Sequence, residues 1–310
     1  MATSEPSPAV TPVAANDATA VLVNHNSGAR LASLFGFLMP EVRGAVVVDN
    51  ASTDGSLDAV AELPGVSVVR NAGNRGFAAA ANQGAGGAQG EWLLFVNPDI
   101  HLLPGQITAL LHGVPDDVAV VAPLQVDEHD TPRSETGGYE PSLSRYLVWA
   151  VVPVRFHRKL GPWLAPPFPT RDTELDWASG ALLGVRREVF ERLGGLDEKF
   201  FLYHEDIEFA RRVRAAGHRV LVRPAVRLHH EVSHGDPSRR VNAGLRSTES
   251  LALDFPPGWR RRALGLVLGL GYGLRALLAR GTTQAVARAT LLHCRTLIAG
   301  RLPVRLTNGR

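Results

Sequence analysis

The stretch AVVVDNASTDGS at residues 45–56 decides the fold. Its first four residues are apolar and mostly β-branched, which favours a short buried strand, and polar or small residues follow at once. The same arrangement occurs at AVLVNHNS (20–27), VSVVRNAGNRG (66–76) and WLLFVNPD (92–99). Continuous apolar strands of this kind predict a mostly parallel sheet covered on both faces. We therefore expect an α/β protein whose polar loops meet at one edge of the sheet.

Outward from this stretch, strands and helices alternate along the chain. We expect strands over 20–23, 45–48, 66–69, 92–96 and 118–121, with helices over 31–38, 56–63, 77–85 and 107–111. The proline-rich region 127–175 is predicted to be irregular. Regular structure is expected to resume over 177–184, as helices over 187–193 and 206–216, and as a strand over 219–222.

Composition excludes several classes of protein. Among the 310 residues, 45% are hydrophobic and 20% charged, the balance of a globular protein rather than a disordered chain or a fibre. The single cysteine, Cys294, excludes an internal disulfide scaffold. Neither G-x-G-x-x-G nor G-x-x-x-x-G-K-[ST] occurs, which disfavours nicotinamide and P-loop chemistry. Residues 1–17 have no basic residue and no apolar run, so we expect a disordered leader and a cytoplasmic protein.

Each loop at the expected sheet edge carries polar side chains. Asn24 and Asn26 follow the first strand, Asp49 the second, and Asn97 and Asp99 the fourth. Such residues also build turns and helix caps, which is the alternative for any one loop. Four polar loops at one edge instead indicate a pocket of nucleotide size. A carboxylate at the position of Asp99 is suited to hold a divalent cation against phosphate oxygens.

Two further groups of residues can carry chemistry. Glu205 and Asp206 follow the aromatic-rich stretch FLYH (201–204) and open an expected helix. Acids in a first turn are favoured by the helix dipole, but they also suit a general base. His229, His230 and His234 are expected to form a loop after the strand over 219–222, where they could contact phosphate or metal or be structural.

These motifs together resemble glycosyltransferase family 2, in its bacterial rhamnosyltransferase-like branch. The resemblance covers residues 19–235 and is carried by VDNASTDGS (48–56), NRGFAAAANQG (74–84), FVNPD (95–99), residues 177–220 and the histidine pair at 229–230. It implies a GT-A fold, a Rossmann-like and mostly parallel central sheet flanked by helices. It also implies an inverting transfer from a nucleotide-activated sugar.

The resemblance also implies roles for individual residues. Asp49 matches the residue that reads the nucleobase, and Asp206 matches the general base, with Glu205 as the second candidate. Asp99 matches the last carboxylate of the family's D-x-D motif, which binds Mg²⁺ or Mn²⁺, together with His229 or His230. Asn97 departs from that motif and removes one charge, so strict metal dependence is left open. The residues expected to bind the nucleotide sugar are Asn24, Asn26, Asp49, Asn74, Arg75, Gly76, Asn97, Asp99, Trp177, Ser179 and Gly180.

The basic charge of the chain lies in its last 56 residues. Residues 255–310 hold ten arginines and no acid, a charge of +10, which leaves −7 for residues 1–254 of a chain whose total is only +3. The uncharged run 263–274 is shorter than the ~20 residues that a transmembrane helix needs. With Trp259 and the flanking arginines it fits a helix in the interface of an anionic membrane. The alternative is a helix packed on the catalytic domain.

From these features we expect a glycosyltransferase that moves rhamnose from dTDP-rhamnose to a lipid-linked or polysaccharide acceptor in bacterial cell-envelope biosynthesis. The expected acceptor is polyprenyl-diphosphate-linked, at the inner face of the plasma membrane, and no nucleic acid partner is expected. The alternatives are a UDP-sugar-dependent galactofuranosyl- or hexosyltransferase, and a non-catalytic nucleotide-sugar-binding scaffold. The expected domains are the leader 1–17, a GT-A domain 18–250 with a nucleotide-binding part 18–125 and an acceptor and catalytic part 126–250, and a basic amphipathic helical tail 251–310.

Overall fold

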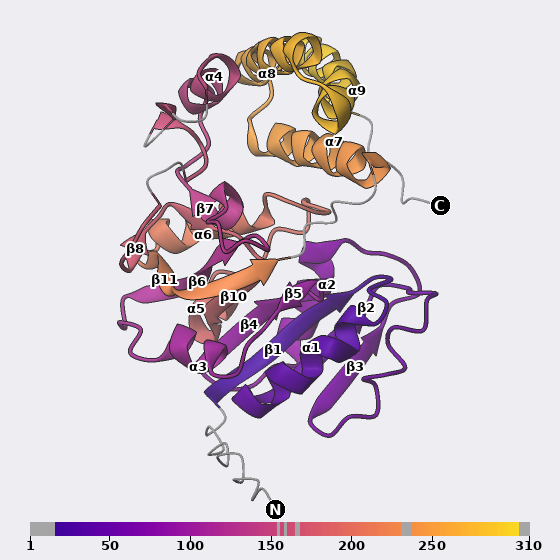
Figure 1. The fold of residues 1–310 in the computed structure, drawn as a ribbon, viewed down its shortest axis with the longest axis vertical. Coiled ribbons are helices and arrows are strands. Elements are labelled where there is room, and N and C mark those ends of the chain that lie inside the picture. The colour runs from indigo at the N-terminus through magenta and orange to yellow at the C-terminus, as the bar shows by residue number, and fades with distance from the viewer. Residues whose placement is uncertain (1–15, 154–155, 158–159, 165–167, 231–236, 304–310) are drawn as a thin grey trace, which may run out of the picture.

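A computed structural model describes residues 16–153, 156–157, 160–164, 168–230 and 237–303 (Figure 1). The strands are β1 (Asn16–Asn24), β2 (Val42–Asp49), β3 (Val66–Arg70), β4 (Trp92–Val96), β5 (Ile100–His101), β6 (Val118–Val126), β7 (Gly137–Gly138), β8 (Thr173–Glu174), β9 (Trp177–Ala178), β10 (Leu182–Arg186) and β11 (Arg219–His230). The helices are α1 (Arg30–Leu38), α2 (Phe77–Gly86), α3 (Gln106–Leu111), α4 (Leu143–Val151), α5 (Arg187–Arg192), α6 (Glu205–Ala215), α7 (Pro237–Asp254), α8 (Trp259–Leu278) and α9 (Gly281–Ile298), with 3-10 turns η1 (Met39–Glu41) and η2 (Ser134–Thr136).

The central sheet is mostly parallel, as the apolar strands predict. Within the described residues its order is β3-β2-β1-β4-β10-β6-β11-β5, and β8 pairs with β11. The strands β3, β2, β1, β4, β6 and β11 run in one direction, whereas β10, β5 and β8 run antiparallel to their neighbours. Asn24 pairs with Asp49, and Asp49 pairs with Arg70. The carboxyl ends of β1, β2 and β3 therefore lie level at one edge.

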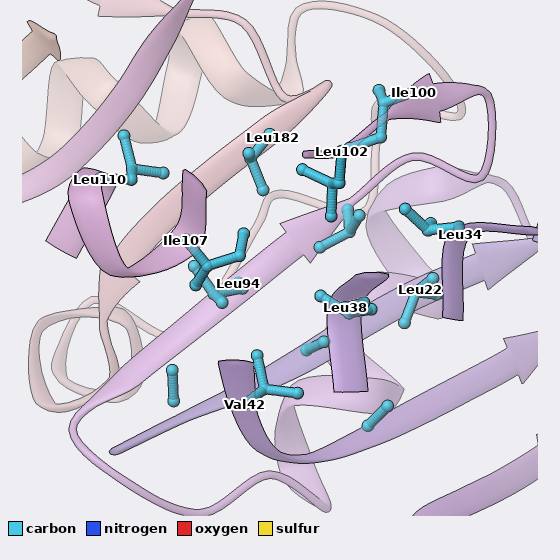
Figure 2. Close-up of a cluster of buried hydrophobic side chains, with 14 of the residues drawn as sticks. Leu22, Leu34, Leu38, Val42, Leu94, Ile100, Leu102, Ile107, Leu110 and Leu182 are labelled. Carbon is cyan, nitrogen blue, oxygen red and sulfur yellow. The ribbon is translucent and has the colours of Figure 1, made fainter. Parts of the chain in front are cut away.

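Both faces of this sheet are buried. Along β4, Leu94 lies in a cluster with side chains of α1 and α3, including Leu38 and Ile107 (Figure 2). Its neighbours Leu93 and Phe95 pack on the other face, against α2, α5 and α6. The alternation follows because successive strand residues point to opposite faces. Burial of one leucine such as Leu94 stabilises the fold by about 1.5–3 kcal/mol.

The expected helix over 56–63 is wrong, because this segment forms a series of turns. Asp54 accepts hydrogen bonds from the backbone N–H groups of Ser56 and Gly28, which ties the start of the segment to the loop after β1. Leu57 and Val60 are nevertheless buried in the core. The apolar spacing therefore reports burial here, and the side-chain hydrogen bonds decide the backbone conformation.

Two other expectations change in the structure. The region 127–175 contains the helix α4, whose N-cap residue Ser142 accepts a hydrogen bond from the backbone N–H of Arg145. The strand expected over 219–222 continues to His230, so His229 and His230 lie on a strand rather than in a loop. That extension is stabilised by pairing with β5, which no local pattern signals. His234 lies outside the described residues, as do residues 1–15 of the expected leader.

The carboxyl-terminal helices form a layer of their own. Figure 1 shows α4, α8 and α9 together at one end of the molecule, with α7 between them and the sheet. A separate hydrophobic cluster holds this layer together, with contributions from Tyr146, Phe255, Leu264 and Cys294. Helix α7 crosses the expected domain boundary at residue 250. Within the described residues, no helix has both the length and the apolar character needed to cross a membrane.

Candidate active site

The loops after β1 and β2 form one buried hydrogen-bond network. The Asn24 amide nitrogen is 2.8 Å from Asp49 Oδ1 and 2.9 Å from Ser56 Oγ. Asp49 Oδ2 accepts from the backbone N–H of Ser52 at 3.1 Å, and Asn26 Oδ1 accepts from that of Thr53 at 2.9 Å. The structure therefore brings together Asn24, Asn26 and Asp49, as the sequence predicts.

The loop after β3 contacts the segment that precedes α6. Asn74 Oδ1 accepts a hydrogen bond from the backbone N–H of Gly76, and Arg75 is exposed beside it. Gly76 has φ +85°, and a Cβ atom there would lie 2.5 Å from the Phe201 carbonyl oxygen. The backbone N–H of Phe77 donates to that same oxygen at 2.7 Å. Only glycine fits at position 76, because the backbone of the segment 201–206 lies directly against it.

Asp99 and His230 form a candidate cation-binding pair by their chemistry and distance. His230 Nε2 lies 3.3 Å from Asp99 Oδ1, and His230 Nδ1 lies 3.1 Å from Gln125 Oε1. His229 points away from Asp99, because adjacent strand residues face opposite sides. Asp99 also lines a cavity of about 200 Å³ beside α1, so solvent reaches it. Of the two histidines that the sequence offers, the structure brings His230 to Asp99.

The residues at this point fit a divalent cation that is shared with a substrate. Across the described ranges, no group of three or more His, Cys, Asp or Glu side chains could hold a metal by itself. Mg²⁺ is commonly bound by one or two protein groups plus substrate phosphates and waters, rather than by a complete protein cage. Asp99 and His230 would supply the protein ligands of such a site. Asn97 lies half-buried nearby in sequence, with its backbone N–H bonded to the Ala181 carbonyl at 2.9 Å.

The segment 201–206 presents the two candidate bases from a strained turn. Tyr203 and His204 both have φ 70°, a left-handed conformation that costs about 1–3 kcal/mol in a non-glycine residue. The turn is held in place by Ser250 of α7, whose hydroxyl donates to the Leu202 carbonyl at 2.8 Å. Helix α6 then begins at Glu205, so both acids lie in its first turn.

The surroundings of Glu205 and Asp206 separate their roles. Burial and the neighbouring Asp206 raise the pKa of Glu205 well above its ordinary value, and Glu205 Oε2 has no hydrogen-bond partner among the described residues. Burial also raises the pKa of Asp206, to about 6, against the lowering effect of its hydrogen bonds. Those bonds come from the backbone N–H groups of Gly180 at 3.2 Å and Ile207 at 2.8 Å. Asp206, with a pKa of about 6, is therefore mostly ionised at neutral pH, whereas burial beside Asp206 favours the protonated form of Glu205.

Two further predicted binding residues, Trp177 and Ser179, are bonded to the segment 136–139. Trp177 is buried, and its indole N–H donates to the Tyr139 carbonyl at 3.2 Å. The backbone N–H of Ser179 donates to the Thr136 carbonyl at 2.9 Å. Trp177 therefore packs in the core beside Gly180, and its part in binding the nucleotide sugar stays a prediction.

Sequence reasoning missed Gln125, Tyr203 and Arg246. Gln125 is identified only by its contact with His230. Burial raises the pKa of Tyr203, as do the charges of Glu205 and Asp99, whereas the charge of Arg246 lowers it. Tyr203 therefore lies among these three charged groups. Arg246 comes from α7, beyond the motifs that carry the resemblance, and no spacing in the sequence connects it to them.

Comparison with known proteins identifies the family. The model of the family described as "Glycosyl transferase family 2" matches residues 31–194. An N-acetylglucosaminyl-diphospho-decaprenol L-rhamnosyltransferase of Mycobacterium tuberculosis is 30% identical over 282 residues, which cover 83% of this chain and 88% of the relative. The rhamnosyltransferase WbbL of Escherichia coli is 26% identical over 153 residues, covering 49% of this chain and 56% of the relative.

A solved structure supports the fold. The mannosyltransferase PcManGT of Pyrobaculum calidifontis, solved in complex with GDP-Man and Mn²⁺, superposes with a TM-score of 0.56 at 18% identity. The match covers 96% of this chain and 89% of that one. The resemblance read from the sequence is thus confirmed: the chain is a glycosyltransferase with a GT-A fold, and it belongs to the bacterial rhamnosyltransferase-like branch of glycosyltransferase family 2.

Proposed function

We propose that this enzyme transfers rhamnose from dTDP-rhamnose, with inversion at the anomeric carbon, to a polyprenyl-diphosphate-linked acceptor in bacterial cell-envelope biosynthesis. The relative of Mycobacterium tuberculosis is named for transfer of L-rhamnose to such a lipid, which supports the sugar and the class of acceptor. The observation that carries the chemistry is Asp206, an ionised carboxylate fixed by the N–H groups of Gly180 and Ile207. It lies at the end of the turn that packs against the loop of Gly76.

In this proposal Asp206 acts as the general base. It takes the proton of the acceptor hydroxyl as that oxygen forms a bond to the anomeric carbon, and the bond from that carbon to the diphosphate breaks. The bonding electrons leave with the nucleoside diphosphate, so negative charge develops there. Asp99 and His230 would hold Mg²⁺ or Mn²⁺, which when bound supplies electrostatic stabilisation of that charge. One base and one attacking hydroxyl are sufficient, and no covalent enzyme intermediate is needed.

A thermal-shift screen of nucleotide sugars, with and without Mn²⁺, tests the donor. At a ligand concentration of 100 Kd, binding adds about 2.7 kcal/mol to stability. For a domain of this size, that raises the melting temperature by about 5 °C or more. We expect dTDP-rhamnose to give this shift and UDP-hexoses to give a smaller one. A larger shift with a UDP-sugar would indicate a hexosyltransferase, and no shift or turnover with any donor would contradict the proposal.

The acceptor is proposed to reach the enzyme at the inner face of the plasma membrane, and the two faces of α8 support this location. One face packs closely on α4 and α9: a Cβ atom at Gly265 would lie 2.7 Å from the backbone of Ile298, and one at Gly271 would lie 2.6 Å from the Trp149 ring. The opposite face carries exposed apolar side chains, with Trp259 70% and Leu277 81% exposed. Leu266 and Leu270 lie between them at helical spacing and are also exposed.

This arrangement combines the two alternatives that the sequence left open for the tail. The helix packs on the protein, and it also leaves an apolar face of Trp259, Leu266, Leu270 and Leu277 uncovered in the described structure. Arginines without any acid surround this face in sequence, which favours an anionic lipid surface as its partner.

We expect the full-length enzyme to float with vesicles that contain phosphatidylglycerol. Replacing Leu266, Leu270 and Leu277 together by glutamine is expected to weaken binding about tenfold or more, because their apolar surface no longer enters the interface. The matched control is L103Q, since Leu103 is 57% exposed but lies outside the tail. Equal flotation of the triple variant and wild type would contradict membrane docking through α8.

A further inference from the structure

Arg246 is a partly buried cation whose N–H groups have no hydrogen-bond partner among the described residues. It lies on α7 with its guanidinium carbon 4.9 Å from the centre of the Phe201 ring. Other arginines near the site are neutralised: Arg211 donates to Glu140 and Asp254, and Arg212 donates to Glu208. Among the described residues, no carboxylate or carbonyl oxygen is bonded to Arg246. Its positive charge and its planar set of N–H donors therefore remain available to a ligand.

The position of Arg246 is set by the active-site turn. Phe201, on which it stacks, has its carbonyl oxygen against Gly76 and bonded to the N–H of Phe77. Two residues further along, Tyr203 lies within the electrostatic reach of Arg246, Asp99 and Glu205. Arg246 is therefore beside the loop predicted to hold the donor and close to the acids of the site.

The chemistry of a guanidinium at this place points to a phosphate ligand. A cation–π contact fixes the plane of the guanidinium without using its N–H groups. Arginine binds phosphate oxygens in a bidentate manner, through charge-assisted hydrogen bonds. The site contains several acids, yet none of them is bonded to this arginine. An anionic ligand that pairs with the guanidinium would explain why it lies there. Residues 1–254 carry a net charge of −7, so a cation without an acid partner provides local attraction for an anion.

We propose that Arg246 forms a diphosphate-binding site at the edge of the active site. This inference rests on the proposed function, in which both reactants carry a diphosphate: the nucleotide sugar and the polyprenyl-linked acceptor. Helix α7 contacts both the active-site turn and the carboxyl-terminal helices. Ser250 of α7 holds the turn at Leu202, and α7 packs on α9 of the tail. The shared ligand chemistry is a diphosphate, and kinetics distinguish its source.

The test is the binding of inorganic pyrophosphate by isothermal titration calorimetry to full-length wild type and R246Q. Loss of the charge-assisted bonds is expected to weaken binding about 10- to 100-fold. R246M repeats the measurement with the apolar stem still able to pack on Phe201, in case R246Q does not fold. R288Q is the control for non-specific binding to the basic tail, since Arg288 is exposed on α9, and its affinity is expected to stay at the wild-type value.

Steady-state kinetics then identify the source of the diphosphate. If Arg246 binds the donor, KM for the nucleotide sugar rises in R246Q and KM for the lipid acceptor does not; the reverse result assigns it to the acceptor. Unchanged pyrophosphate affinity in the folded neutral variants would overturn the proposal. So would a loss of affinity in R288Q as large as that in R246Q. If wild type transfers no sugar, the proposed function fails, while the pyrophosphate measurement still decides the role of Arg246.

Discussion

Replacing Asp206 by asparagine is expected to lower the transfer rate by about 10²–10⁴-fold, the usual contribution of a general base. Asparagine keeps an oxygen that can accept from the N–H groups of Gly180 and Ile207, so the site should keep its shape. Donor binding, measured by calorimetry, should therefore be retained. The matched control is E205Q, because glutamine resembles the protonated form that burial favours for Glu205. A collapse of activity in E205Q with normal activity in D206N would reverse the two roles.

The same residue predicts a pH dependence of activity. The pKa of Asp206 is raised by burial to about 6, so the base is ionised above that pH and protonated below it. In wild type, log kcat should fall with unit slope as the pH drops through about 6. In wild type the pH–rate profile reports apparent pKa values of the Glu205–Asp206 pair. The profile of E205Q is therefore measured as well, because Asp206 is then the only acid of the pair. A flat profile down to pH 5 would contradict a buried base.

Stability should change in the opposite direction to activity in D206N. A carboxyl whose folded-state pKa lies above its unfolded value binds a proton more tightly when folded, so ionisation destabilises the fold as the pH rises from about 4 to 6. D206N removes this cost, and at pH 7.5 it is expected to stabilise the enzyme by up to about 3 kcal/mol. Near pH 4 the gain should disappear. Urea denaturation at the two pH values measures the difference.

Replacing Asp99 by asparagine is the second large expected effect. We expect transfer to fall by about 10²-fold or more, because one of the two protein groups that would hold the cation loses its charge. The concentration of Mn²⁺ that gives half-maximal activity should rise in parallel, and Mn²⁺ binding in the presence of dTDP should weaken in electron paramagnetic resonance. Full activity of D99N at the wild-type Mn²⁺ concentration would contradict a role in holding metal.

The two adjacent histidines supply a matched pair for this prediction. H230Q removes the imidazole that lies 3.3 Å from Asp99, so it should shift the Mn²⁺ requirement in the same direction as D99N. H229Q changes the neighbouring side chain, which faces the other side of β11, and should leave the requirement unchanged. Equal shifts of the Mn²⁺ requirement in both variants would mean that the substitutions disturb β11 and that His230 is not a metal ligand.

Much of the site was predictable because its residues follow buried strands directly. Asn24 and Asp49 end β1 and β2 at paired positions, so strand polarity alone brings them together. The segment 56–63 shows the limit of this reasoning: its apolar spacing fits a helix, but it forms turns, and Asp54 accepts hydrogen bonds from the backbone N–H groups of Ser56 and Gly28 where the segment begins. The bond from Gly28 joins two separate loops, and a periodic pattern within one segment contains no information about it.

The sequence by itself determined the parallel sheet, its polar edge, the family and the two acids at 205–206. These follow from apolar runs and motifs within a few neighbouring residues. Only the tertiary structure decided that backbone N–H groups stabilise the ionised form of Asp206 while burial favours the protonated form of Glu205. It alone also decided that His230 and not His229 meets Asp99, and that Arg246 stacks on Phe201. The physical reason is that protonation and ligand binding depend on burial and on distances between side chains, which are set by segments far apart in the chain.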